Sequence, residues 1–247
     1  MNKQEISPPV VMVVGGMDPS GGAGLCADIQ TLAAMGCHAA PVVTALTIQD
    51  TTAVEKFQLL EADLIQAQMQ AVLNDMSISA VKTGMLGNRA IVSMIASVLK
   101  GRPDIPLIVD PVISSNKNDR LSEDSLTYSI NQLLLPIASL VSPNIPEAAL
   151  LAGKEASAPV DADECAALLY SPDSRCECMI TGTHAETSAV INRYYRQGSM
   201  LRQWVWPRLQ FEYHGSGCTL ASAIAAGIAQ GLDMEQALDH AQRFVIN

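Results

Sequence analysis

Short apolar runs alternate with amphipathic stretches along most of this 247-residue chain. Residues 10–14 are continuously apolar and mostly valine, which predicts a parallel strand buried on both faces. Shorter runs at 41–46, 80–82, 106–109, 140–142 and 179–180 predict further strands. Residues 187–213 are rich in Tyr, Trp and Val, a composition typical of edge strands.

The stretches between these strands have helical periodicity. Residues 23–35 predict a helix that ends at Gly36, because glycine is common just past a helix C-terminus. Further helices are predicted at 62–73, 90–99, 122–134, 146–151, 219–231 and 234–245. Strands that alternate with helices in this way predict an α/β fold with a mostly parallel sheet covered on both faces. No linker or repeat interrupts the pattern, so we expect a single domain over residues 1–247.

Polar and glycine-rich segments follow the predicted strands, at 15–22, 47–52, 83–87, 110–120, 142–147 and 181–184. The carboxyl ends of parallel strands share one edge of a sheet, and ligands of such sheets bind beyond that edge. We therefore expect these segments to converge on one site.

Composition narrows the function of this site. The chain is 49% apolar and 16% charged with a net charge of −10, which disfavours a nucleic-acid surface. Phosphate ligands remain possible, because backbone N–H groups and a metal ion can hold them. The apolar runs are too short to span a membrane, and the first residues have no signal-peptide pattern. The six cysteines form no CxxC pair, so we expect a reducing, cytoplasmic setting.

The segment HGSGCT at 214–219 precedes a predicted helix of small residues. A glycine-rich turn at a helix N-terminus directs N–H groups toward one point, which suits the charge of a transferring phosphoryl group. Cys218 lies at this terminus, where we expect a lowered pKa and a role as base or nucleophile. The alternative is that Cys218 is only a small residue at a tight helix start.

Asn144 and Glu147 open another predicted helix, three residues apart. An amide and a carboxylate at this spacing can reach Mg²⁺ through its waters, and they can equally form a helix-capping pair. Asp110 ends a predicted strand nearby, where it either steers a metal or substrate hydroxyl or only closes a turn. The segment GAGLCA at 22–27 fits a dinucleotide fingerprint, but the turn before it is too long for that geometry.

Six ordered motifs together resemble one family. They are GMDPSGGAG at 16–24, VTALTIQDT at 43–51, KTGML at 82–86, VDPV at 109–112, SPNIPEA at 142–148 and HGSGCTL at 214–220. They resemble the hydroxymethylpyrimidine/phosphomethylpyrimidine kinases of the ribokinase-like class, over about residues 10–230. The resemblance implies a three-layer sandwich, a homodimer, and transfer of phosphate from ATP with Mg²⁺ to a pyrimidine hydroxymethyl group and then to its monophosphate, in thiamine biosynthesis.

The resemblance also implies roles for individual residues. Gln49 would read the pyrimidine edge, since a carboxamide both donates and accepts hydrogen bonds. The residues that would line or support the substrate pocket are Ala23, Asp28, Thr47, Met85 and Val112. Asn144, Glu147 and Asp110 would hold Mg²⁺ and nucleotide phosphates. Gly215, Ser216 and Gly217 would form the anion hole, and Cys218 would act as the base.

Three segments depart from the family pattern, and one of them, between residues 152 and 187, looks shortened. Thr181, Gly182, Thr183 and His184 stand where Lys-Gly-Gly-His is usual, so Thr181 and Thr183 are expected at the nucleotide without a basic contact. The flap after Val112 is also altered, with Lys117 as a substitute cation. Two rival functions remain open: a pyridoxal kinase on the same scaffold, and a pyrimidine-binding protein with weak transfer activity.

Overall fold

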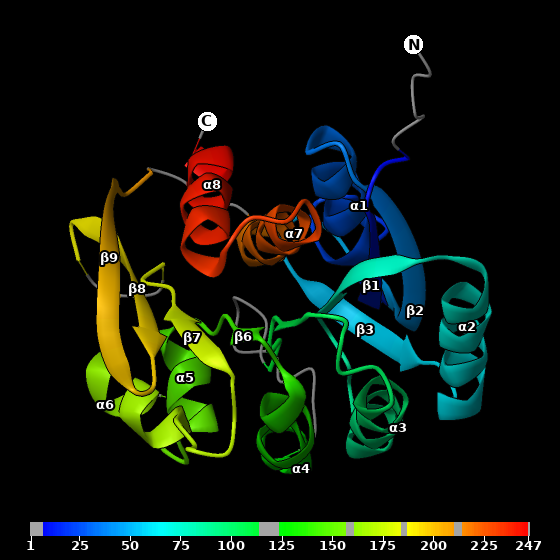
Figure 1. Cartoon of the computed structure of the whole chain (residues 1–247), viewed down its shortest axis with the longest axis horizontal. Coiled ribbons are helices and arrows are strands. Elements are labelled where there is room, and N and C mark those ends of the chain that lie inside the picture. Colours follow the sequence, from blue (N-terminus) through cyan, green and yellow to red (C-terminus); the bar gives the residue numbers. More distant parts are fainter. Residues whose placement is uncertain (1–6, 114–123, 157–160, 184–186, 210–213, 247) are drawn as a thin grey trace.

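A continuous β-sheet runs through the centre of the protein in the computed structural model, which describes residues 7–113, 124–156, 161–183, 187–209 and 214–246 (Figure 1). Within these residues the sheet has nine strands in the order β3-β2-β1-β4-β5-β6-β7-β8-β9. The strands are β1 (Val10–Met17), β2 (His38–Gln49), β3 (Val54–Leu59), β4 (Ile78–Thr83), β5 (Leu107–Val109), β6 (Leu140–Val141), β7 (Glu177–Ile180), β8 (Ala189–Arg196) and β9 (Ser199–Pro207).

The central strands are parallel, as predicted. β1 pairs in parallel with β2 and β4, and the parallel ladder continues through β5 and β6 to β7. β3, β8 and β9 pair antiparallel at the two sides of the sheet. The carboxyl ends of β1, β2 and β4 to β7 therefore lie along one edge, and the segments that follow them meet there.

Helices cover both faces of the sheet, which confirms the three-layer α/β sandwich (Figure 1). One face carries α1 (Gly24–Ala34), α7 (Ser216–Ala229) and α8 (Met234–Ile246); the other carries α2 (Ala62–Asp75), α3 (Arg89–Lys100), α4 (Asp124–Ser129), α5 (Ile145–Leu151) and α6 (Ala162–Leu169). Successive side chains of β1 enter opposite cores: Met12 and Val14 pack toward α2 and α3, while Val11 and Val13 pack toward α1 and α7. This is why the run at 10–14 is apolar at every position.

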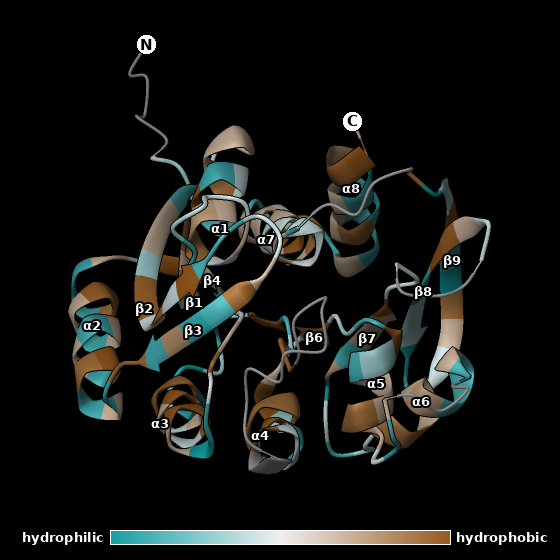
Figure 2. Cartoon of the chain, turned by 180° about the vertical axis from the view of Figure 1, so that it is seen from behind, coloured by the Kyte–Doolittle hydropathy of each residue, from teal (hydrophilic) through white to brown (hydrophobic). Residues whose placement is uncertain are grey.

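Three elements differ from the sequence prediction. β3 was not predicted, and Figure 2 shows hydrophilic colour along much of it, because this edge strand exposes Glu55, Lys56 and Gln58. Helix α6 was also missed. The helix predicted at 122–134 is described from Asp124 as α4, followed by a π-helical turn (Ile130–Leu134) and a 3₁₀ turn with Pro136 (Leu135–Ile137). No helix among the described residues is long and apolar enough to cross a membrane.

Candidate active site

The turn between β1 and α1 is organised by the buried carboxylate of Asp18. It accepts hydrogen bonds from the backbone N–H of Ser20 at 2.7 Å and of Ala23 at 2.8 Å, and from the Ser20 hydroxyl at 2.9 Å. Gly24 has a φ of +52°, and a Cβ atom there would lie 2.3 Å from the carbonyl oxygen of Gly16. The sequence at 16–24 therefore folds into a tight turn that only glycine permits at its end.

The start of α7 lies directly against this turn. Gly215 has a φ of +85°, and a Cβ atom there would lie 1.9 Å from the carbonyl oxygen of Gly22. Helix α7 begins at Ser216, three residues earlier than predicted, so Ser216, Gly217 and Cys218 form its first turn. The N–H groups of a first turn have no partner within the helix, so this turn can receive an anion.

Cys218 lies in the first turn of α7, against the start of α1. The Gly24 N–H donates to its sulfur, and the positive charge of Lys82 favours the thiolate. Although part of the residue is exposed, burial of the sulfur has the largest effect and, with Asp110 and Asp28, raises the pKa of the Cys218 thiol above its ordinary value. Our expectation of a lowered pKa is therefore wrong, because the surrounding protein outweighs the helix terminus.

A buried ionic cluster supports this corner of the site, and sequence reasoning missed its centre, Lys82. The ammonium group of Lys82 lies 2.9 Å from Asp28 Oδ1 and 3.3 Å from Asp110 Oδ2, and its side chain is 0% exposed. The hydroxyl of Ser222, one helical turn after Cys218, donates to Asp28 at 2.7 Å. Burial alone would lower the pKa of Lys82, but the negative groups around it, Asp28 foremost, raise it.

Asp28 was expected to line or support the substrate pocket. Its side chain is 0% exposed and is bound by Lys82 and Ser222, which favours the supporting role over the lining one. The sequence did indicate this pair, because a lysine in an otherwise buried strand, here Lys82, must have a negatively charged partner.

Gln49 and Thr47 lie near the glycine-rich turn, at the end of β2. The Gln49 Nε2 atom is 3.1 Å from His214 Nε2, and His214 Nε2 is 3.8 Å from Asp18 Oδ2. The Thr47 hydroxyl donates to the carbonyl of Met17 at 2.8 Å, which ties β2 to β1. Gln49 thus lies beside His214, two residues before the first turn of α7, while the hydroxyl of Thr47 donates to the backbone.

The remaining residues expected at the substrate pocket also converge. Met85 packs against Val112 and Ala45, and its sulfur would lie 3.1 Å from a Cβ atom at Gly16. Ala23 is 9% exposed at the glycine-rich turn. The Met85 side of the site is therefore mainly apolar.

Asn144 and Glu147 form the capping box that was the alternative to a metal site. The Asn144 side chain accepts from the Glu147 N–H, and the Glu147 carboxylate accepts from the Asn144 N–H, both at 2.9 Å. Glu147 is buried, and burial together with the nearby Asp110 carboxylate raises the pKa of Glu147 to about 8. The two roles are compatible, because a carboxylate that caps a helix can still contact water on a metal.

Mg²⁺ fits the oxygen donors at this point. It binds through one or two carboxylates, several waters and substrate phosphates, and does not need a complete protein cage. Asp110 Oδ2 is buried without a hydrogen-bond donor, although Lys82 lies nearby, so it has room for a positive partner. Among the described residues there is no cluster of three or more carboxylate, His or Cys ligands.

The segment after β7 continues the same edge. Thr181 bridges to Asn144, and its N–H donates to the Pro143 carbonyl at 2.9 Å. Thr181 is nearly buried and Thr183 is exposed. His184 and the altered flap at 114–119, including Lys117, lie outside the described residues.

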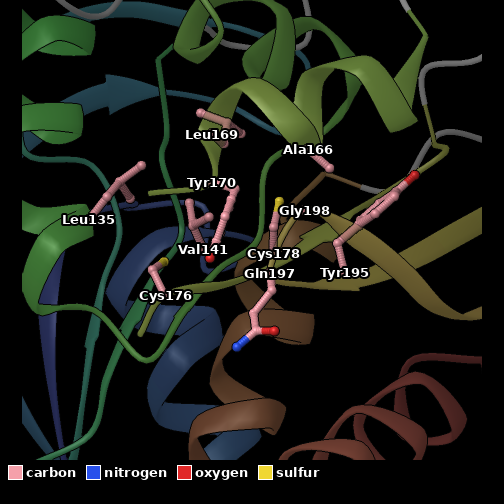
Figure 3. A pocket seen from close by; sticks show the side chains of 10 residues that line it. All are labelled: Leu135, Val141, Ala166, Leu169, Tyr170, Cys176, Cys178, Tyr195, Gln197 and Gly198. Atoms are coloured by element: carbon pink, nitrogen blue, oxygen red, sulfur yellow. The ribbon is translucent and has the colours of Figure 1, made fainter. Parts of the chain in front are cut away.

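A small cavity occurs elsewhere, near the amino end of β7 and the turn between β8 and β9 (Figure 3). Its volume of about 10 Å³ holds at most a water molecule. Its lining comprises Leu135, Val141, Ala166, Leu169, Tyr170, Cys176, Cys178, Tyr195, Gln197 and Gly198, and it shares no residue with the site described above.

Solved structures that match this fold include small-molecule kinases. The pyridoxal kinase of Staphylococcus aureus in complex with ADP matches with a TM-score of 0.86 and 28% identity, covering 97% of this chain and 87% of that chain. The phosphomethylpyrimidine kinase of Clostridium difficile 630 matches with a TM-score of 0.79 and 27% identity, covering 97% and 98%. The fold is therefore that of the ribokinase-like kinases.

Sequence relatives narrow the assignment. The hydroxymethylpyrimidine/phosphomethylpyrimidine kinase of Streptomyces coelicolor is 37% identical over 97% of this chain and 88% of its own length. A thiamine biosynthetic bifunctional enzyme of Arabidopsis thaliana is 36% identical over 97% of this chain and 46% of its own length. A sequence model described as Phosphomethylpyrimidine kinase matches residues 18–247. The chain belongs to the phosphomethylpyrimidine kinase family, as its motifs indicated.

Proposed function

We propose that this chain transfers the γ-phosphoryl group of ATP to the hydroxymethyl group of 4-amino-5-hydroxymethyl-2-methylpyrimidine, and then to the resulting monophosphate, in thiamine biosynthesis. The observation that carries the proposal is the contact of Gly215 with Gly22, which brings the first turn of α7 against the glycine-rich turn and beside Gln49. Gln49, which would bind the pyrimidine ring, and the first turn of α7, which would bind an anion, therefore lie next to each other.

On the substrate side, Gln49 offers its amide to the ring nitrogen and amine of the pyrimidine, while Met85, Val112 and Ala23 pack against the ring. This places the hydroxymethyl oxygen near the first turn of α7. Holding the two reactants in line supplies a large part of the rate in such transfers.

On the nucleotide side, Asp110, Asn144 and Glu147 would hold Mg²⁺, which neutralises phosphate charge when bound, and Thr181 and Thr183 lie beside them. Glu147→Gln should raise the Mg²⁺ concentration that gives half-maximal activity, because a neutral amide is a weaker partner for a hydrated cation. An unchanged Mg²⁺ titration would leave Glu147 with a capping role alone.

Cys218 is proposed to contact the reacting hydroxyl. Its raised pKa keeps the thiol protonated at neutral pH, which weakens the case for a base. In a loose transition state the alcohol proton need not leave early, and the N–H groups at residues 216–218 stabilise the transferred phosphoryl group. We therefore assign most of the catalysis to this turn and less to the sulfur.

A direct assay tests the function and its rivals. Purified protein is incubated with Mg-ATP and hydroxymethylpyrimidine, its monophosphate or pyridoxal in parallel, and phosphorylated products are measured. We expect kcat/KM to be highest for the two pyrimidines. Preference for pyridoxal would make the chain a pyridoxal kinase, and tight pyrimidine binding without product would make it a binding protein.

Three further features are proposed: a single kinase domain over residues 1–247 and a cytoplasmic setting, both from the sequence pattern, and a homodimer from the family resemblance. Light scattering should give twice the mass of the chain at micromolar concentration. A monomer mass over that range would overturn the dimer and leave the catalytic proposal unaffected.

A further inference from the structure

The segment at 181–183, which is expected at the nucleotide, is bound by an arginine from another part of the chain. Arg208 follows β9, and its guanidinium donates to three carbonyl oxygens after β7. Nη1 lies 2.6 Å from the Thr183 oxygen, Nη2 lies 3.2 Å from the Gly182 oxygen, and Nε lies 2.8 Å from the Thr187 oxygen. The planar guanidinium thus fixes the direction of several peptide groups at once.

The other side of the same loop is also fixed. The Gly182 N–H donates to Asn192 Oδ1 at 3.0 Å, and Asn192 in turn donates to Gln242 at 2.9 Å. A Cβ atom at Gly182 would lie 2.4 Å from the Ile191 carbonyl oxygen, so the loop lies directly on β8. With Thr181 bridged to Asn144, the loop is held between the Asn144 side of the site and Arg208.

Phosphate groups bound at this edge would need a positively charged partner. Thr181 of the loop bridges to Asn144, whose capping partner Glu147 lies near Asp110, and residues 181–183 have no basic side chain. Lys82 is fully buried between Asp28 and Asp110, so it cannot reach a bound phosphate. Arg208 is only partly buried at the loop surface, and arginine suits phosphate oxygens in charge and shape.

We propose that Arg208 is the nucleotide-positioning residue of this chain. It fixes the 181–183 loop through the carbonyl oxygens of Gly182 and Thr183, and it adds positive charge where the ATP phosphates bind. The inference rests on the proposed kinase function, but its test does not need catalysis.

The experiment compares Arg208→Gln and Arg208→Lys with a matched control, Arg202→Gln. Arg202 is on β9 and is paired with Asp239 of α8, away from the loop. Titration calorimetry gives the Kd of ATP and ADP in the full-length proteins, thermal unfolding gives their stability, and steady-state kinetics give KM for each substrate.

Loss of a charge-assisted contact should weaken nucleotide binding about tenfold or more in Arg208→Gln. The KM for hydroxymethylpyrimidine should stay within about twofold, and Arg202→Gln should bind nucleotide as wild type does. Arg208→Lys should recover part of the affinity, and raised salt should weaken nucleotide binding less in Arg208→Gln than in wild type.

Three results would overturn the proposal: unchanged nucleotide Kd in Arg208→Gln, equal losses for nucleotide and pyrimidine with a fall in Tm, or an Arg208→Lys variant no better than Arg208→Gln. Failure of the kinase proposal gives a different result. If ATP binding weakens in Arg208→Gln as expected but the wild-type protein phosphorylates no pyrimidine, only the proposed function is refuted. If the wild-type protein binds no nucleotide, the proposed function and the role of Arg208 are both refuted.

Discussion

Replacing Lys82 with methionine tests whether the ionic cluster beneath the site is as important as its geometry indicates. Methionine has a similar length and suits a buried strand, so the main change is the loss of one positive charge. Asp28 would keep only the Ser222 hydroxyl as a partner, and Asp28 Oδ2 has no hydrogen bond even in the intact protein. Asp110 would lose its neighbouring cation at the same time.

The magnitude follows from the distances. With an effective dielectric constant of about 20, a pair at 2.9 Å gains about 6 kcal/mol and one at 3.3 Å gains about 5 kcal/mol. Desolvation of the three charges offsets much of this, and removal of one partner from a buried pair costs about 3–5 kcal/mol. Since a domain is stable by only about 5–15 kcal/mol, Lys82→Met should be severely destabilised.

Urea unfolding followed by circular dichroism measures this cost. The exposed Lys100→Met serves as the control and should change the free energy of unfolding by less than about 0.5 kcal/mol. The double variant Lys82→Met/Asp28→Asn should be more stable than Lys82→Met, because the uncompensated carboxylate is gone. A loss below about 1 kcal/mol in Lys82→Met, or additive losses in the double variant, would refute the reasoning.

Three further substitutions test the site. Gln49→Ala should weaken pyrimidine binding by about 1–3 kcal/mol with little change in the KM for ATP; equal small changes for pyrimidine and pyridoxal would show that Gln49 does not read the ring. Cys218→Ser should keep kcat within about tenfold of wild type, whereas a loss of about 10²–10⁴-fold would restore the base role. Glu147 has a pKa of about 8 in the folded protein against an ordinary value of 4.5, so its carboxyl reduces stability as the pH rises between these values. In urea unfolding, Glu147→Gln should therefore match wild type near pH 4 and exceed it by up to about 5 kcal/mol near pH 9; an equal difference at both pH values would contradict this.

The sequence predicted those elements in which the pattern of apolar residues matches the pattern of burial. β1 has an unbroken apolar run and α1 has helical periodicity, and each was found close to its expected bounds. β3 escaped prediction because it is an edge strand with exposed charged and polar side chains, so its pairing with β2 stabilises it more than its own pattern does. Local periodicity cannot reveal such partners.

For the candidate site, the sequence predicted the turns and the helix cap but not the contacts between residues far apart in the chain. The glycine-rich turns were found because tight turns require glycine, and the capping box of Asn144 and Glu147 follows from three-residue spacing. The pKa of Cys218 was predicted in the wrong direction, because it depends on burial and on carboxylates far away in sequence. Arg208 carried no signal at all, since its partners are backbone carbonyls of another loop.

The hydrogen bond from Ser222 to Asp28 joins residues that are 194 positions apart. During synthesis on the ribosome, β1, α1 and β4 are complete long before α7 has been translated. Until α7 emerges, the Lys82–Asp28 pair lacks the hydrogen bond from Ser222 and is not covered by that helix. A nascent chain that stops before residue 214 would therefore hold Gln49 and the turn between β1 and α1 without the first turn of α7.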